Sequence, residues 1–221
     1  INARSGQSLK TNSLLRTAKP GRMHVMLGNG RQFRMGGDAQ LRLGASDVEL
    51  LRGSLIGWIK PGMPRLNPFT IKTRLATASI QGTTVFLELT DQQFKVFSWE
   101  GTVQVETSSG RRFTLTSGQQ LLLDLKRQTD EVSGRLDGLE PAFGELSGGI
   151  VTPPTTGRGG SRSPRARQQQ SQEFSWDPPQ LIPAQDAERR LQRSLLINGF
   201  STPLETLPDI ERELGVAAPS S

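Results

Sequence analysis

The sequence predicts an all-β fold, an antiparallel β-sandwich or β-roll of short strands and hairpins, followed by a disordered linker and short C-terminal helices. Three observations indicate this class. Short β-rich runs alternate apolar and polar residues with a period of two. Turn residues separate these runs about every eight to twelve residues. The stretch 69–123, which holds the clearest of these runs, has no 3.6-residue periodicity, which argues against a helical alternative.

The N-terminal part begins with residues 1–20, which have few apolar positions and are expected to form a loose leader. Residues 23–27 and 31–35 flank Gly28-Asn29-Gly30, a strong hairpin signal. A third glycine of a dinucleotide-binding loop is missing, so this is no nucleotide site. Gly36-Gly37-Asp38 predicts a further turn before the next strand.

The stretch 69–123 predicts a ladder of strands. Residues 69–75 alternate as a half-buried strand does, and small residues before Gly82 indicate a close backbone approach or a bulge. Residues 94–99 are apolar on both faces, which predicts a strand covered on two sides. Glu100-Gly101 is expected to form a two-residue hairpin loop in which the glycine supplies a positive φ.

A proline-rich loop precedes this ladder. Residues 50–59 form an apolar run that stops at Lys60, and Pro61, Pro64 and Pro68 stiffen the connection that follows. Loops of this kind on a β scaffold carry binding surfaces, but they also serve as plain connections between sheet layers. Both readings stay open at this stage.

The chain divides into a leader 1–20, a β domain 21–146, a Pro/Gly/Arg/Gln-rich linker 147–180 and a helical tail 181–221. Residues 125–144 are expected to hold one more strand or a loosely packed segment. The linker has a short run of arginines without interleaved aromatic residues, so nucleic-acid binding is disfavoured and a solvated tether is the simpler interpretation.

The tail is expected to form two short amphipathic helices. Asp186 is the predicted N-cap of the first, Ala187, Leu191 and Leu195 recur at four-residue spacing, and Asn198-Gly199 ends it. Pro208 is expected to break the second helix.

Helices this short need a surface for their apolar faces, either the β domain of the same chain or another protein. Trp176, in the segment just before them, is a candidate second anchor.

Four motifs resemble the FecR-type domain. They are the strand 48–55 with its glycine, the small-residue run 73–83 ending in Gly-Thr, the hairpin 101–105 and the Leu-Thr-Ser-Gly-Gln of 115–119. Their order and spacing resemble the family over about residues 35–124. The positions that match its pattern, which we expect to have structural roles, are Gly53, Thr73, Ala78, Gly82, Thr83, Gly101, Val103 and Gly118.

The resemblance implies a protein-interaction role in the cell envelope. Members of the family commonly form the periplasmic part of a membrane-spanning regulator that senses an outer-membrane receptor and controls a sigma factor. This sequence has no helical sigma-binding segment and no run apolar enough to span a bilayer. Because the chain begins at Ile1, removal of an N-terminal signal or anchor is expected.

Composition points away from catalysis. There is no cysteine and no tyrosine, and His24 is the only histidine, so neither a metal site nor a catalytic triad is indicated. We therefore expect no enzyme activity, no catalytic or metal-binding residue, and no cofactor. The net charge of +6 comes from residues 1–146, with 19 basic and 13 acidic side chains, against 8 of each in 147–221. Such an excess favours anionic partners, or is simply a solvated face.

The sequence therefore favours a non-enzymatic, extracytoplasmic interaction or scaffolding module whose partner is an envelope receptor, membrane regulator or complex subunit. One alternative is the sensor part of an anti-sigma regulator. Another is binding of an anionic glycan, with Trp58 and Trp99 stacking on sugars. The candidate interaction residues are Trp58, Trp99, Trp176, Leu191 and Leu195.

Overall fold

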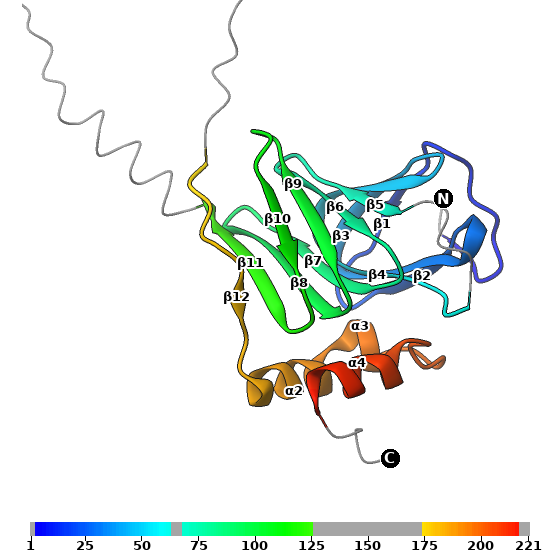
Figure 1. The fold of residues 1–221 in the computed structure, drawn as a ribbon. Helices are drawn as coiled ribbons and strands as arrows, with labels where there is room; N and C mark the ends of the chain where they lie inside the picture. Colours follow the sequence, from blue (N-terminus) through cyan, green and yellow to red (C-terminus); the bar gives the residue numbers. More distant parts are fainter. Residues whose placement is uncertain (1–2, 63–67, 126–173, 217–221) are drawn as a thin grey trace, which may run out of the picture.

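The computed structural model describes residues 3–62, 68–125 and 174–216. It confirms the predicted class: the chain is mostly β, with a curled sheet and short C-terminal helices (Figure 1). The sheet occupies one side of the molecule, and the helices lie together against its outer face.

Short connections join most consecutive strands as far as residue 124, and a long segment separates the last two strands. Two long strands dominate the N-terminal part, and shorter ones follow as hairpins. The elements are β1 (Leu14–Arg16), β2 (Arg22–Met26), the 3₁₀ turn η1 (Gly28–Gly30), β3 (Arg31–Leu43), β4 (Asp47–Ile59), β5 (Phe69–Lys72), β6 (Ala76–Ile80), β7 (Thr84–Leu89), β8 (Gln93–Glu100), β9 (Val103–Thr107), β10 (Arg112–Leu115), β11 (Gln119–Asp124) and β12 (Gln180–Leu181).

In the described residues all twelve strands belong to one sheet, in the order β10-β9-β6-β5-β4-β7-β8-β11-β12, with β3 adding β1 and β2 beside β4. The central strand is β4, which pairs with β3 and β7 antiparallel and with β5 parallel. That parallel pair departs from the predicted antiparallel arrangement. It arises because the chain leaves the end of β4 and returns beside its beginning, where Asp47 faces Thr70.

The sheet is covered on both faces. Its concave face encloses the main core, which includes Phe33, Leu55 and Phe94. Residues in the opposite phase of the same strands, such as Trp58 and Phe97, form a second apolar cluster with the helices. Strand β8 carries both phases, which confirms the prediction of a strand covered on two sides.

Gly53 is where β4 changes phase. Before it Val48 and Leu50 point into the main core, and after it Leu55 and Ile59 do. A shift between even and odd positions requires an irregular residue. Gly53 has φ +92°, and a Cβ there would lie 2.4 Å from the Cα of Ala39 on β3.

The opposing stretch of β3 is irregular as well, and this corrects the turn expected at residues 36–38. Gly36, Gly37 and Asp38 lie inside β3, where the register with β4 shifts between Gly36 and Gln40. Gly37 and Asp38 both have positive φ. These residues therefore make a bulge in a continuous strand, which bends it without ending it.

The structure confirms two of the predicted hairpins. Strands β2 and β3 pair across Gly28–Gly30, as expected. Gly101 has φ +69° between β8 and β9, which confirms the positive φ expected there. Gly82, with φ +73°, lies in the turn between β6 and β7, so the alternative of a bulge in a strand is wrong.

Three helices follow β12, and they differ from the predicted helices in detail. They are α2 (Ala184–Arg193), α3 (Leu195–Asn198) and α4 (Leu207–Leu214). The N-cap of α2 is Pro183, and Asp186 lies in the first turn, where its charge suits the helix dipole. Pro208 is the second residue of α4 and does not break it, because a proline in the first turn sacrifices no helical hydrogen bond.

Two strands of the sheet extend beyond the predicted bounds of the β domain. The leader 1–20 contains β1, which pairs with β3, and the linker 147–180 ends in β12, which pairs with β11. Linker residues 147–173, which include its arginine run, and the segment expected after residue 125 lie outside the described residues, as do residues 63–67 of the proline loop.

Replacing Gly53 by alanine should lower the free energy of unfolding by at least about 2 kcal/mol, because it combines backbone strain with overlap against Ala39. Urea unfolding would measure this. Gly28→Ala is the matched control, since a Cβ there has nothing within 4 Å, and its effect should stay within about 0.5 kcal/mol. Equal effects of the two changes would contradict the role assigned to Gly53.

Candidate functional site

Arg34 joins the sheet to the C-terminal segment. It lies on β3, points to the outer face and is fully buried. Its Nη1 donates to the carbonyls of Leu196 and Ile197 at 3.2 and 2.9 Å. Its Nη2 donates to the carbonyls of Thr202 and Pro203 at 2.6 and 3.1 Å. One guanidinium therefore satisfies the carbonyls at the end of α3 and in the loop before α4.

The surroundings of this charge are aromatic. The Arg34 guanidinium lies 4.5 Å from the ring centre of Phe200 and 5.4 Å from that of Trp58. Burial lowers the pKa of Arg34, and the nearby carboxylate of Glu205 opposes that shift. Its Nε has no hydrogen-bond partner among the described residues. The cation is compensated mainly by backbone dipoles and π faces, with Glu205 as the nearby countercharge.

Glu205 ends a chain of side-chain hydrogen bonds. Its Oε2 accepts from Gln32 Nε2 at 2.7 Å and from Trp58 Nε1 at 3.3 Å, while Lys60 Nζ lies 3.6 Å from Oε1. Gln32 Oε1 in turn lies 2.9 Å from His24 Nε2. Because Gln32 Oε1 can only accept, we assign the His24 proton to Nε2. Burial lowers the pKa of His24, and its bond to Gln32 works in the opposite direction.

A second set of bonds attaches α4 to the hairpin ends of the sheet. Thr84 Oγ1 lies 2.6 Å from Thr206 Oγ1 and 3.0 Å from Glu100 Oε1. On the next turn, Glu213 Oε2 accepts from the Gly101 amide at 2.7 Å and from Ser117 Oγ. The helix is therefore fixed over the loop between β8 and β9.

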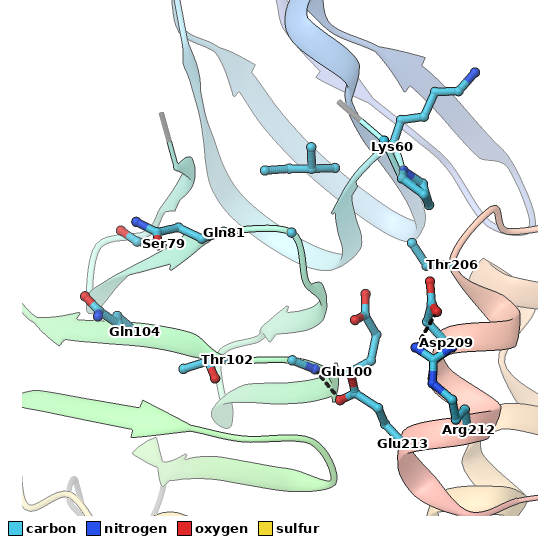
Figure 2. A pocket seen from close by; sticks show the side chains of 15 residues that line it. Lys60, Ser79, Gln81, Glu100, Thr102, Gln104, Thr206, Asp209, Arg212 and Glu213 are labelled. Carbon is cyan, nitrogen blue, oxygen red and sulfur yellow. Dashed lines mark hydrogen bonds and ion pairs between the residues drawn. The ribbon is translucent and has the colours of Figure 1, made fainter. Parts of the chain in front are cut away.

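A polar cleft of about 410 Å³ opens beside α4, between the end of β4, the turn from β6 to β7 and the hairpin from β8 to β9. Figure 2 shows Lys60, Gln104 and Thr102 on the sheet side, and Asp209 and Arg212 on the helix side. Asp209 Oδ1 accepts from Arg212 Nη2 at 2.6 Å. We call this the polar cleft.

The polar cleft is suited to binding. Its charged groups already have partners within the chain, as the Asp209–Arg212, Glu213–Gly101 and Lys60–Glu205 contacts show. His24, the one histidine, does not line it. Among the described residues no group of three or more side chains is arranged to hold a metal ion. What the cleft offers is a set of hydrogen-bonding groups from two parts of the chain.

The candidate interaction residues fall into three places. Trp58, Trp99 and Leu191 are buried in the second cluster, beneath the helices. Trp176 is buried against the main core, where its ring lies 5.7 Å from that of Phe94. Leu195, expected on the buried stripe, is 63% exposed because α2 ends before it and a new helix begins.

The stacking of Trp58 and Trp99 on sugars is therefore wrong. Their exposed fractions are 0% and 3%, so neither ring presents a face to solvent. The tail docks in cis, on the β domain of the same chain, which is one of the two interpretations left open by the sequence. Ala187, Leu191 and Ile210 pack in the same apolar cluster as Trp58 and Trp99.

The positions taken from the FecR pattern have structural surroundings. Thr73 Oγ1 accepts from the amides of Leu75 and Ala76 and so fixes the turn between β5 and β6. Thr83 Oγ1 donates to the Thr102 carbonyl at 3.0 Å. The others occupy turns, bulges or buried strand positions: Gly53, Ala78, Gly82, Gly101, Val103 and Gly118. Gly82 and Gly101 also line the polar cleft.

Sequence reasoning missed Arg34, Glu205 and Thr206. Arg34 lies in the out-of-phase position between Phe33 and Met35, where the pattern predicts a solvated residue. Because the covering segment follows more than 160 residues later, nothing local marks that position as buried. No helix in the described part is long and apolar enough to cross a membrane.

Arg34→Met should lower the free energy of unfolding by about 3 kcal/mol, since buried carbonyls lose their donors. Limited proteolysis should then cut within residues 174–216 before the sheet. The matched control is Arg16→Met, because Arg16 is exposed on β1. Unchanged unfolding and cleavage in Arg34→Met would contradict the role of this side chain.

His24 should make stability depend on pH. Its folded pKa lies below the ordinary 6.5, so the unfolded chain binds the proton more readily. The free energy of unfolding should be constant well above pH 6.5 and should fall as the pH drops below 6.5 toward the folded pKa. Thermal unfolding of His24→Gln should show a weaker loss between about pH 7 and pH 5. Identical pH profiles would contradict this assignment.

Comparison with known proteins gives a family match for part of the β region. None of the curated proteins matches the chain significantly. Two crystal structures of proposed anti-sigma factors from Parabacteroides distasonis are similar, both at 16% identity, with TM-scores of 0.46 and 0.47 over 52% and 57% of this chain. The chain spans 55% and 65% of their lengths. Residues 13–104 match the family model described as FecR protein. This match, over less than half of the chain, confirms the resemblance to the FecR-type domain that the sequence motifs predict.

Proposed function

We propose that this chain is a non-enzymatic, extracytoplasmic sensor module of a FecR-like anti-sigma regulator, and that it acts by binding a protein partner. The observation that carries the proposal is the FecR match over residues 13–104. The family is regulatory, which favours a signalling role over the scaffolding role that composition alone suggests. The outer-membrane or inner-membrane partner would be a receptor or a membrane regulator.

The polar cleft is the surface that we assign to this partner. Lys60 and Gln104 come from the FecR-type domain, whereas Asp209 and Arg212 come from α4. A partner in the cleft would contact both parts at once, so its binding would be coupled to the docking of α4. That coupling is what a sensor requires: the partner's affinity depends on whether the helix is in place.

Cis docking also changes how the scaffolding alternative is tested. The apolar faces of α2 and α4 are already occupied by the second cluster, so they are not free anchors for another protein. A scaffold would have to use exposed surface instead. The two functions then differ in one readout, because only the regulator changes transcription when its cleft is altered.

The test is site-specific photo-crosslinking in cells that produce the full chain. A photoreactive residue at Gln104, which is exposed at the polar cleft, should form a covalent complex with an envelope receptor or regulator, identified by mass spectrometry. The same residue at Arg16 on β1 is the matched control and should not form that complex.

Transcript levels provide the second readout. Gln104→Arg should change the expression of genes that depend on one alternative sigma factor, while Arg16→Met leaves them unchanged. A complex that forms at position 104 without any change in transcripts would support a scaffold and overturn the regulator. The absence of a position-specific complex would overturn the assignment of the cleft.

A further inference from the structure

A second cavity lies on the outer face of the sheet, beside α2 and α3. It is an open groove of about 640 Å³ and shares no lining residue with the polar cleft. Strands β2, β3, β4, β7 and β8 form its floor and one side, and the two helices form the other. Its volume falls within the range of about 300–1,000 Å³ typical of small-molecule sites. We call it the basic groove.

The floor of the basic groove is apolar, and several of its residues have small side chains or none. Half-buried Phe86 on β7 and exposed Leu195 on α3 supply its apolar surface, and the almost fully buried Phe97, Trp99 and Leu196 close the floor beneath them. Gly36, Gly37 and Ser54 lie next to them. The small residues at Gly37 and Ser54 leave space above the sheet, whereas Arg22 and Leu196 pack against Gly36. The bulge in β3 therefore creates room that an ordinary strand would fill.

The rim of the groove is cationic. Lys19, Arg22, Lys95, Arg190 and Arg193 line it, against one carboxylate, Glu88. Lys95 Nζ lies 3.5 Å from Glu88 Oε2, so that pair is neutral. Arg190 lies 5.4 Å from the ring centre of Phe97, which places a positive charge directly above the apolar floor. The groove as a whole attracts an anion that also carries an apolar body.

The groove is poorly suited to an extended peptide. Strand β7 pairs on both sides with β4 and β8, and β8 pairs with β7 and β11, so neither offers a free edge for strand addition. The hydroxyl of Ser54 already donates to the Gly36 carbonyl. A bound main chain would leave its polar groups unpaired, whereas a hydrocarbon chain has none.

A bilayer surface fits the groove no better. Membrane-binding faces carry protruding apolar side chains. Among the described large apolar side chains that are exposed, which are Leu14, Met26, Leu181 and Leu195, only Leu195 lines the groove. The apolar surface is concave and sized for one chain.

We propose that the basic groove binds a free, single-chain anionic amphiphile, an acyl chain with a carboxylate or phosphate head. The chain would lie against Phe86 and Leu195. The head would face the cations of α2 and of the loop before β2, where Arg193 and Lys19 are exposed. This binding does not depend on the protein partner assigned to the polar cleft, because the two sites are separate.

The test is titration of the full chain with dodecanoate below its micelle concentration, followed by calorimetry. Saturable binding is expected, weakening with salt. Dodecanol, with the same chain and no charge, should bind at least about tenfold more weakly. Equal affinity for the two compounds, or no saturable binding of dodecanoate, would overturn the proposal.

Variants distinguish binding in the groove from a general effect of surface charge. Lys19→Glu with Arg193→Glu should weaken dodecanoate binding by about tenfold or more, whereas Arg74→Glu, an exposed change in the turn after β5, should not. Ser54→Phe should fill the groove and abolish binding, with thermal unfolding as the check that it folds. Equal effects of the reversals at the groove and at Arg74 would overturn the proposal. So would binding restricted to anionic phospholipid vesicles or to an acidic peptide.

Discussion

The buried guanidinium of Arg34 is the constraint on which the outer face of the molecule depends. It replaces water for four backbone carbonyls of the C-terminal segment, at 2.6 to 3.2 Å. Those carbonyls could not be covered by an apolar side chain without losing their hydrogen bonds. Arginine is suited to this role because its fork of donors keeps its charge even in a desolvated site. With the segment fixed there, Trp58 and Trp99 are buried and α4 reaches the hairpin ends.

Two irregular strand positions make the two-sided sheet compatible with this docking. The phase change at Gly53 turns the later half of β4 so that Leu55 faces the main core while Ile56 and Trp58 face the helices. Opposite it, the bulge in β3 keeps Phe33 and Met35 inside. The same bulge leaves the small residues over which the basic groove opens. One local departure from ideal pairing therefore serves packing on one face and creates a cavity on the other.

The sequence predicts the features that depend on residues close together in the chain. Alternation over residues 69–75 and 94–99 identifies strands, and glycines in tight loops identify hairpins, because both signals act within a few residues. It does not predict the parallel pairing of β4 with β5, the bulge at residues 36–40, or the burial of Arg34. Each depends on a partner distant in the chain. The tryptophans illustrate the same limit: the pattern shows that Trp58 faces away from the core but not that a helix covers it.

The long separation between partners bears on the order in which the chain folds. Arg34 and the carbonyl of Leu196 are 162 residues apart, and Trp58 and Glu205 are 147 apart. Contacts of such high order form slowly, because a large loop must close first. During synthesis, the strands up to β11 can form most of their inner core while their outer aromatic face is still bare. Until residues 184–214 arrive, that face is an aggregation hazard, which makes the nascent chain a natural client for a chaperone.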